Sequence, residues 1–378
     1  MTRREWLASL GTALGAAPLV KSALADTAPA SPVSIARCPS YNDDVTAVLG
    51  GMFDQLGGME HLVRNKTVVI KINMTGAPSN RLNGMAPAVT HYVHPKVLGA
   101  AAYLLGRAGA RRIRFAESPW ATTAPLEEVM LDSGWNVRSL QSAAQGVEFA
   151  NTNFIGKYKG YARFTVPAKP YMYAAYDLNR AYEEADVFVS IAKLKNHAIC
   201  GVTLSIKNCF GCLPASVYGD DAGAGEPNEN PGAGRLRVGH EGRRQPSKSA
   251  PQELHFGANH DPGYRVPRIV ADLAAARPIH LSIIDGVQSV AGGEGPWIRG
   301  LRVVQPGLLI AGLNAVSTDA VSTAVMGYNS RATRGTAPFP DCDNTLLLAE
   351  ALGAGSADLR RIEVRGLAID KAIYRYGS

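Results

Sequence analysis

Short apolar runs alternate with amphipathic segments along most of the chain. A run of about four to eight apolar residues between turn signals is typical of a buried strand, whereas apolar residues spaced at the helical period indicate a helix. On these criteria we expect strands at residues 67–73, 112–117, 135–140, 186–191, 279–285, 307–311 and 362–364. We expect helices at residues 45–56, 95–106, 125–133, 266–276, 315–326 and 345–352.

This alternation predicts an α/β fold, with a mainly parallel sheet covered by helices on both faces. Residues 215–261 interrupt the pattern, because they are rich in glycine, proline and charged residues and show almost no periodicity. A long irregular insertion in a compact domain is usually a functional lid or a disordered loop. We therefore expect one α/β domain over residues 26–378, with this insertion as its lid or as a disordered loop.

The N-terminal residues have the layout of an export signal. Arg3 and Arg4 precede a weakly apolar stretch, and Ala23-Leu24-Ala25 has the small-x-small form of a cleavage site. A membrane-spanning helix needs about 20 mostly apolar residues, more than this stretch provides. We interpret residues 1–25 as a twin-arginine signal peptide, although an ordinary secretory signal shares much of this layout.

Export by this route predicts where the protein works and what it meets. We expect a periplasmic or extracellular protein that contacts the twin-arginine translocase during export and has no stable membrane anchor. The mature chain keeps a mild basic bias, since the whole sequence has a formal net charge of +7. Its basic residues lack the clustering that nucleic-acid binding requires. We expect an anionic small-molecule ligand and no nucleic-acid partner.

The sequence contains five cysteines, of which Cys209 and Cys212 form a C-x-x-C motif. An odd number in an exported protein leaves at least one thiol unpaired or bound to another group. The motif alone fits a redox pair, half of a metal site or coincidence. A second C-x-x-C motif, which a four-thiolate site needs, is missing, so we expect no iron–sulfur cluster.

The densest polar segment follows the expected strand at 186–191. Lys193, Lys195 and His197 are two residues apart, so on an extended backbone their side chains point to the same side. This spacing fits a cradle for an anion, with His197 as acid, base or ligand. A solvated loop would contain the same residues, and the segment alone leaves both interpretations open.

Polar residues also follow other expected strands. Lys71, Asn73, Glu117 and Asp285 stand at or just after strand ends, as Lys193 does. In open α/β sheets the ligand crevice lies outside the carboxyl ends of the strands. The sequence therefore predicts a site at this edge of the sheet.

One long block makes the sequence recognisable. Residues 185–214 (ADVFVSIAKLKNHAICGVTLSIKNCFGCLP) resemble the central signature of the bacterial and archaeal family called domain of unknown function 362. The resemblance continues at 68–74 (VVIKINM), 94–105 (HPKVLGAAAYLL), 116–119 (AESP), 283–297 (IIDGVQSVAGGEGPW) and 307–328 (GLLIAGLNAVSTDAVSTAVMGY). Many members of that family carry an appended ferredoxin-like segment, and this chain contains no such cysteine pattern. The resemblance therefore does not imply an electron-transfer role.

The resemblance also implies a set of site residues. Lys71 and Asn73 stand where the family has Lys-Pro-Asn, with Ile72 in place of the proline. We expect catalytic roles for Lys71, Lys193, Lys195 and His197. We expect ligand binding by Asn73, Glu117, Thr203, Lys207 and Asn208.

The acidic positions of the C-terminal blocks suggest a cation site. Asp285, Glu294 and Asp319, with help from Glu117 and His197, would offer the oxygen-rich ligands that Mg²⁺ or Mn²⁺ prefers. Simpler interpretations stay open for each, because Asp285 precedes a glycine in a turn, Glu294 lies in a glycine-rich loop and Asp319 lies in a helix.

These observations favour an exported enzyme that acts on an anionic small molecule with a Lys/His/carboxylate site and a divalent cation. Two alternatives remain. The protein could be a non-catalytic periplasmic ligand-binding protein, or a thiol redox protein that uses Cys209 and Cys212.

Overall fold

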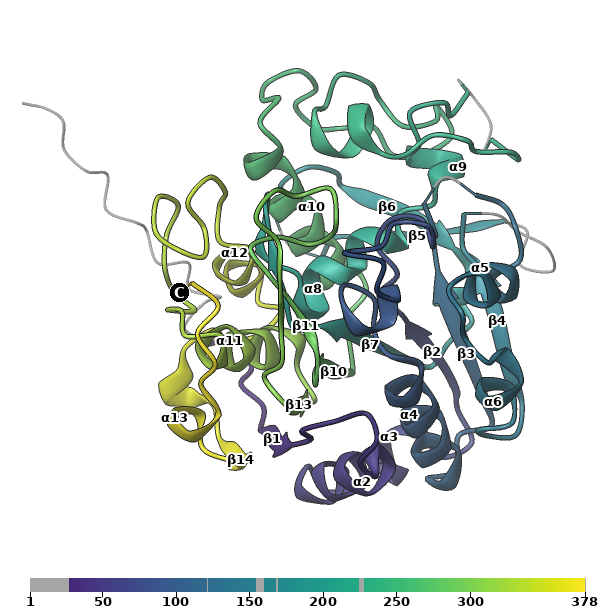
Figure 1. Cartoon of the computed structure of the whole chain (residues 1–378). Coiled ribbons are helices and arrows are strands. Elements are labelled where there is room, and N and C mark those ends of the chain that lie inside the picture. Colours follow the sequence, from purple (N-terminus) through teal and green to yellow (C-terminus); the bar gives the residue numbers. More distant parts are fainter. Residues whose placement is uncertain (1–26, 121, 154–159, 168, 224–227, 378) are drawn as a thin grey trace, which may run out of the picture.

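An eight-stranded sheet forms the centre of the molecule (Figure 1). The computed structural model describes residues 27–120, 122–153, 160–167, 169–223 and 228–377, so the predicted signal peptide lies outside the described residues. The strand order is β14-β1-β13-β10-β7-β2-β3-β4. The strands are β1 (Val33–Arg37), β2 (Thr67–Lys71), β3 (Arg112–Glu117), β4 (Val147–Asn151), β7 (Val187–Lys193), β10 (Leu281–Gly286), β13 (Leu308–Gly312) and β14 (Val364–Gly366).

The sheet is mainly parallel, as the sequence predicts. Neighbouring strands from β10 through β7, β2 and β3 to β4 pair in parallel. Strand β13 runs against both of its neighbours, β1 and β10, while β14 pairs in parallel with β1. One strand of the eight therefore opposes the rest.

Helices cover both faces of the sheet, because consecutive strand residues point to opposite sides. On β2, Val68 and Ile70 belong to one apolar cluster and Val69 belongs to the other. The first cluster includes residues of α2 (Val45–Gln55), α4 (Pro95–Arg107), α5 (Leu126–Asp132) and α6 (Val137–Gln141). The second includes residues of α8 (Leu204–Asn208), α10 (Pro262–Ala276), α11 (Ala315–Val325) and α12 (Thr345–Ala351).

Smaller elements surround this core. Three two-stranded pairs form from β5 (Tyr161–Thr165) with β6 (Ala175–Asn179), β8 (Asn196–His197) with β9 (Gly201–Val202), and β11 (Ser289–Ala291) with β12 (Arg302–Val304). The short helices are α3 (Glu60–Val63), α7 (Arg180–Glu183), α9 (Ala215–Tyr218) and α13 (Ile369–Ala372). Single helical turns are η1 (Pro87–Val89), η3 (Cys209–Cys212), η4 (Leu236–His240) and η5 (Leu359–Arg361).

The strand expected at residues 135–140 is wrong, since this segment forms helix α6. Asn136 explains the difference, because its side chain accepts a hydrogen bond from the backbone N–H of Ser139 and caps the first turn. The apolar residues that suggested a strand are Trp135 and Leu140, and both are buried in the cluster beneath α4 and α5.

The insertion at 215–261 packs on the rest of the domain in its described part. Figure 1 shows it along one end of the molecule, beyond α10 and β6. The Asp220 carboxylate accepts hydrogen bonds from the backbone N–H groups of Leu236 and Arg237, which holds η4 against α9. Glu253 forms a buried ion pair with Arg265 of α10, with 2.6 Å between Oε2 and Nη2. The polar residues of the insertion thus make specific contacts, within the insertion and with α10.

The connections of the sheet define where a ligand can bind. From β2 the chain continues to β3 and β4 on one side, whereas from β7 it continues to β10 on the other. The boundary between β2 and β7 is therefore a topological switch point, and crevices open outside the carboxyl ends of strands at such points.

Candidate functional site

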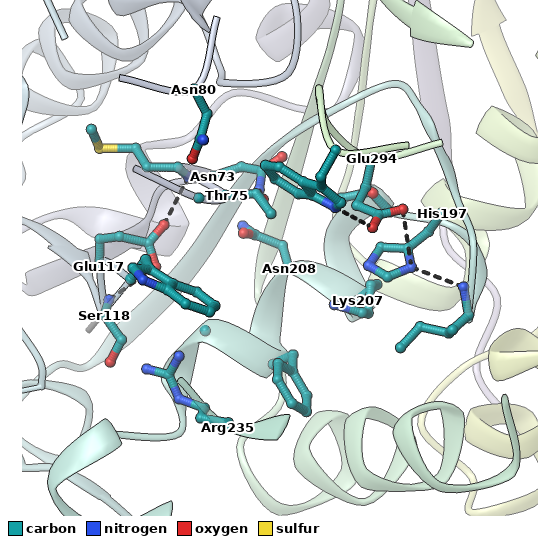
Figure 2. A pocket seen from close by; sticks show the side chains of 18 of the residues that line it. Asn73, Thr75, Asn80, Glu117, Ser118, His197, Lys207, Asn208, Arg235 and Glu294 are labelled. Carbon is teal, nitrogen blue, oxygen red and sulfur yellow. Dashed lines mark hydrogen bonds and ion pairs between the residues drawn. The ribbon is translucent and has the colours of Figure 1, made fainter. Parts of the chain in front are cut away.

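A cavity of about 720 Å³ lies at this switch point (Figure 2). The carboxyl end of β2 supplies Lys71 and that of β3 supplies Glu117, while α8 supplies Lys207 and Asn208. The polar side chains that line it are Lys71, Asn73, Thr75, Asn80, Glu117, Ser118, His197, Thr203, Lys207, Asn208, Arg235, His240 and Glu294. The large apolar ones are Met74, Trp120, Ile199, Phe210, Trp297 and Ile298.

A buried ion pair forms one wall of the cavity. The Lys71 ammonium lies 2.6 Å from Oε1 of Glu117, and the two side chains are 1% and 3% exposed. The ammonium also donates to the carbonyl of Ile72 at 2.6 Å. Backbone N–H groups of Met74 and Ser118 each donate to the Glu117 carboxylate at 2.9 Å. The two charges cancel each other and have partners within the protein. The pair therefore forms part of the cavity wall and adds no net charge to the cavity.

Asn208 links the two strands on either side of the switch point. Its amide nitrogen donates to the carbonyl of Lys71 at 3.3 Å and to the hydroxyl of Ser190 at 3.0 Å, and so joins β2 to β7. Its amide oxygen accepts from the Lys71 ammonium at 3.2 Å. Asn73 and Thr203 line the cavity nearby, where Asn73 donates to Thr75 at 2.9 Å and accepts from the backbone N–H of Lys193 at 3.3 Å.

His197 and Glu294 face each other across 3.8 Å, measured from Nδ1 to Oε2. The backbone N–H of Ile199 donates to Nδ1 of His197, so this nitrogen is the acceptor and the ring proton lies on Nε2. Burial and the nearby Lys207 ammonium lower the pKa of His197 well below its ordinary value. Figure 2 shows Nδ1 turned toward Glu294, which leaves the opposite edge of a neutral ring toward the cavity.

Glu294 is ionised in this setting. Its two oxygens accept from the backbone N–H of Ala198 at 3.0 Å and from Nε1 of Trp297 at 2.9 Å. Burial alone raises the pKa of Glu294, but the charge that His197 carries when it is protonated and these two N–H donors outweigh burial and lower the pKa to about 2. The cavity thus contains a fixed carboxylate beside a neutral imidazole.

Two further cations point into the cavity. The Lys207 ammonium lies 4.8 Å from the centre of the Phe210 ring, and no hydrogen-bond acceptor or carboxylate pairs with it among the residues that the structure describes. Arg235 donates from Nε to the carbonyl of Leu213 and from Nη2 to Asn153, which fixes its guanidinium and leaves Nη1 without such an acceptor in the described ranges. Burial lowers the pKa of Lys207 and lowers that of Arg235 to about 10. Three cations and two carboxylates line the cavity, which gives it a net positive charge.

Lys193, expected to be catalytic, lies outside the cavity lining and is fully buried. Its ammonium donates to the Tyr41 hydroxyl at 2.7 Å, to the Ala88 carbonyl at 2.9 Å and to Asp285 at 2.9 Å. Burial lowers the pKa of Lys193, and the Asp285 carboxylate opposes that effect. With three acceptors, this lysine ties β7 and β10 to the segments that precede α2 and α4.

Lys195 also lies behind the cavity rather than in its lining. Its ammonium, 0% exposed, donates to the carbonyls of His91 at 2.7 Å and Glu294 at 3.0 Å. Burial lowers the pKa of Lys195 to about 7. We expected the side chains of Lys193, Lys195 and His197 to point to the same side of one extended strand. The structure differs, because β7 ends at Lys193 and the chain turns before the short β8 begins.

The carboxylates expected to hold a cation do not share a site. Asp285 accepts from Tyr41, from Lys193 and from the backbone N–H of His94. Asp319 accepts from the backbone N–H groups of Ser205 and Ile206, at the start of α8. Glu294 alone of the three lines the cavity. Within the described ranges no group of three or more His, Cys, Asp and Glu side chains is placed to hold a metal ion, so the geometry supplies no Mg²⁺ or Mn²⁺ centre there.

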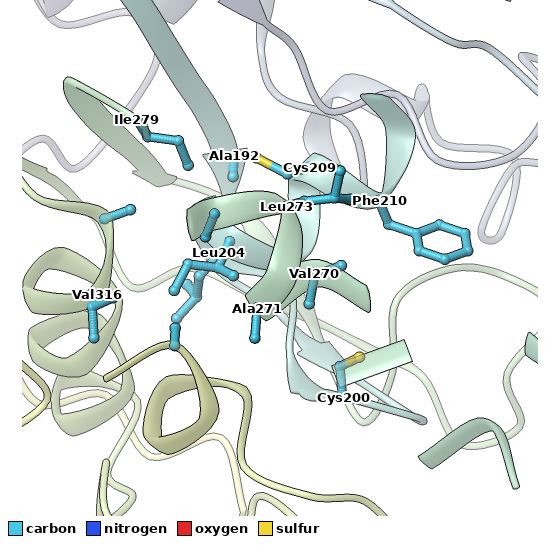
Figure 3. Packing of buried hydrophobic residues seen from close by; sticks show 14 of the residues in the cluster. Ala192, Cys200, Leu204, Cys209, Phe210, Val270, Ala271, Leu273, Ile279 and Val316 are labelled. Carbon is cyan, nitrogen blue, oxygen red and sulfur yellow. The ribbon is translucent and has the colours of Figure 1, made fainter. Parts of the chain in front are cut away.

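Cys209 and Cys212 lie below the cavity in η3, each 2% exposed and with a free thiol. Cys209 belongs to the apolar cluster between the sheet and α10 (Figure 3). Its hydrogen bond to Cys212 and its burial raise the pKa of Cys209. Burial raises the pKa of Cys212, but that hydrogen bond and the Lys71 charge outweigh burial and lower it. Between the two thiols, Gly211 passes so close to Lys71 that a Cβ there would lie 2.8 Å from Nζ.

Sequence reasoning missed several residues of the site. Arg235 belongs to the insertion at 215–261, where no periodic pattern marks single positions. Trp120 and Trp297 were overlooked because a tryptophan carries no titratable group. Both tryptophans directly follow blocks that the sequence assigns to the site, since Trp120 follows AESP and Trp297 follows GGEGP. This position could have identified them.

Fold and site together define an α/β protein with a positively charged ligand cavity at the switch point of its sheet. The family described as domain of unknown function (DUF362) matches residues 68–324, and the chain belongs to this family. A thylakoid-associated protein of Synechocystis sp. is 25% identical over 296 residues, which make up 78% of this chain and 74% of that protein. Over the part of the chain that the structure describes, no helix is long and apolar enough to cross a membrane.

Two solved structures match the chain over part of their length. A crystal structure of a Thermotoga maritima protein is 14% identical, with a TM-score of 0.36, and the match covers 71% of this chain and 55% of that one. The lactate racemase apoprotein of Thermoanaerobacterium thermosaccharolyticum is 12% identical, with a TM-score of 0.34 and coverage of 74% and 55%. The chain thus spans little more than half the length of either protein.

Proposed function

We propose that the cavity binds an anionic small molecule and that the protein acts on it as an enzyme. The observation that carries this proposal is the Lys207 ammonium, which faces the cavity with no carboxylate paired to it among the described residues. Lys207 is partly buried, so part of its hydration is lost without a paired charge, and an anionic ligand would offset that cost. Arg235 adds a fixed guanidinium whose free edge suits a carboxylate or phosphate.

His197 is the residue best placed to act on such a ligand. With Nδ1 occupied by the backbone N–H of Ile199, its Nε2–H is available to a ligand oxygen. A neutral imidazole can stabilise negative charge that develops on an oxygen during a reaction. The Glu294 carboxylate lies 3.8 Å from Nδ1 and would stabilise a positive charge on the ring.

We further propose that the protein works outside the cytoplasmic membrane after twin-arginine export. Arg3 and Arg4 before a weakly apolar stretch support this location. The buried positions of Cys209 and Cys212 do not favour a thiol redox function, because exchange with a partner requires access to a sulfur.

A thermal-shift titration tests anion binding. Inorganic phosphate and malonate should raise the melting temperature of the wild-type protein, since a ligand at a hundredfold excess over its Kd stabilises by about 2.7 kcal/mol. Lys207→Met should lose most of this response. Lys371→Met, which removes a charge from an exposed side chain away from the cavity, is the matched control and should respond like the wild type. An undiminished response of Lys207→Met would refute the assignment.

A turnover experiment separates an enzyme from a binding protein. The wild type is incubated with a mixture of phosphate monoesters and carboxylic acids, and the products are followed by mass spectrometry. We expect conversion by the wild type and its loss in His197→Ala, with anion binding retained. Binding without any conversion would favour the non-catalytic ligand-binding protein.

A further inference from the structure

Two large aromatic side chains stay exposed where the cavity opens. Trp297 is 46% exposed and Trp120 is 58% exposed, and both line the cavity. Arg235, the fixed cation, is 9% exposed. The cavity therefore changes from charged in its depth to aromatic toward solvent. Tryptophan is enriched where proteins contact other molecules, and apolar surface gathered at a groove marks such a contact site.

The ring of Trp297 is held in place before any ligand arrives. Its Nε1 donates to Oε1 of Glu294 at 2.9 Å. The ring also rests on two glycines, because a Cβ at Gly295 would lie 2.3 Å from it and one at Gly76 would lie 2.6 Å from it. Gly76 needs its glycine for a φ of +83° as well, but Gly295 has an ordinary φ. The absence of a side chain at Gly295 thus makes room for the ring. His91 also contacts the ring, with their planes nearly perpendicular and their centres 5.9 Å apart, and 46% of Trp297 stays exposed to another molecule.

Trp120 approaches from another side of the cavity. It follows the end of β3, whereas Trp297 follows β11, which is joined to β10, and two strands separate β3 from β10 in the sheet. A Cβ at Gly234 would lie 2.9 Å from the Trp120 ring, so the insertion at 215–261 also gives up a side chain to admit a tryptophan. Two rings on different elements are each backed by glycine.

The size of the cavity agrees with a ligand larger than a simple anion. Cavities of about 300–1,000 Å³ hold molecules of drug size, and this one measures about 720 Å³. Inorganic phosphate or a three-carbon acid would contact Lys207 and Arg235 and leave the tryptophans uncovered. A flat apolar group attached to the anion would cover them.

We infer that the ligand is an anion that carries an aromatic body, with its charged group at Lys207 and Arg235 and its ring against Trp297. This inference rests on the proposed function and names the substrate class of the same site. Trp297 then has two roles, because the ring that receives the ligand also positions the Glu294 carboxylate beside His197.

Calorimetric titration with a graded series of probes tests this inference. The series is inorganic phosphate, phenyl phosphate and 1-naphthyl phosphate, with acetate, benzoate and 2-naphthoate as its carboxylate counterpart and 1-naphthol as the uncharged control. We expect each series to bind more tightly as the ring is added, by about tenfold from the simple anion to the phenyl compound. We expect 1-naphthol to bind more weakly than 1-naphthyl phosphate.

Two substitutions at Trp297 separate stacking from positioning. Trp297→Leu removes the ring and should abolish the gain in affinity from phenyl and naphthyl groups. Trp297→Phe keeps a ring but loses the hydrogen bond to Glu294, so it should keep most of that gain while any turnover falls. Trp135→Phe, in the core beneath α4 and α5, is the control and should change neither.

The outcomes distinguish this inference from the proposed function. Equal affinity for phosphate and 1-naphthyl phosphate would overturn the aromatic class and leave anion binding intact. Binding of 1-naphthol as tight as that of 1-naphthyl phosphate would overturn the anionic class. Binding of no member of either series would overturn both.

Discussion

Loss of the Lys71 ammonium should cost more stability than any exposed charge. Lys71→Met leaves the buried Glu117 carboxylate without its cation, although the N–H groups of Met74 and Ser118 still donate to it. Breaking a buried ion pair from one side costs about 3–5 kcal/mol. Because two charge-assisted donors remain, we expect about 3 kcal/mol, the lower end of this range.

Urea unfolding followed by tryptophan fluorescence measures this loss. The double variant Lys71→Met/Glu117→Gln should recover part of it, since the uncompensated charge is gone. Arg64→Met is the matched control, because Arg64 pairs with Glu60 on the surface, where each side chain is 63% exposed, and it should change stability by less than about 1 kcal/mol. A loss below about 1 kcal/mol for Lys71→Met, or a double variant no more stable than the single one, would refute this account of the cavity wall.

Three further predictions concern Gly211, Glu294 and the two N-terminal arginines. Gly211→Ala places a methyl group 2.8 Å from the Lys71 ammonium and should destabilise the protein by about 1–3 kcal/mol in calorimetry; an unchanged melting temperature would contradict this. The pKa of Glu294 falls from 4.5 to about 2 on folding, so its stabilisation is present above pH 4.5 and is lost as the pH falls toward 2; Glu294→Gln should flatten that part of an acid-unfolding curve. Lysine at both Arg3 and Arg4 should retain the protein in the cytoplasm on cell fractionation, whereas normal export would point to an ordinary secretory signal.

The sequence predicts the central fold well because burial imposes a period. The expected strand at 112–117 coincides with β3, and the expected helix at 95–106 differs from α4 by one residue. The reversed direction of β13 has no such signal, since an apolar run of five residues looks the same in either direction. The strand at 135–140 failed because a single capping residue, Asn136, outweighed a short apolar pattern.

The site was predictable by position more than by role. Strand-end reasoning found Lys71, Glu117 and Asn73, and the family resemblance added Lys207 and Asn208, which all line the cavity. The sequence does not distinguish a charged residue that faces the cavity from one that is paired within the protein. The difference depends on partners that are distant in the sequence. Tyr41 and Asp285, which bury Lys193, lie 152 and 92 residues away from it.

Lys193 and Lys195 of the lysine-rich signature therefore have a structural role, because they hold the segments that form the cavity wall. Lys195 holds the backbone of Glu294 from behind at 3.0 Å, while the carboxylate of the same residue faces His197. Removal of the Lys195 ammonium would leave two buried carbonyls without a donor and would shift Glu294. A loss of activity in a Lys195 variant would thus act through the loop at 294–298 and would not identify a group that touches the ligand. Lys207 has its ammonium in the cavity, so its substitution tests ligand binding directly, whereas substitution of Lys195 tests the structure of the cavity wall.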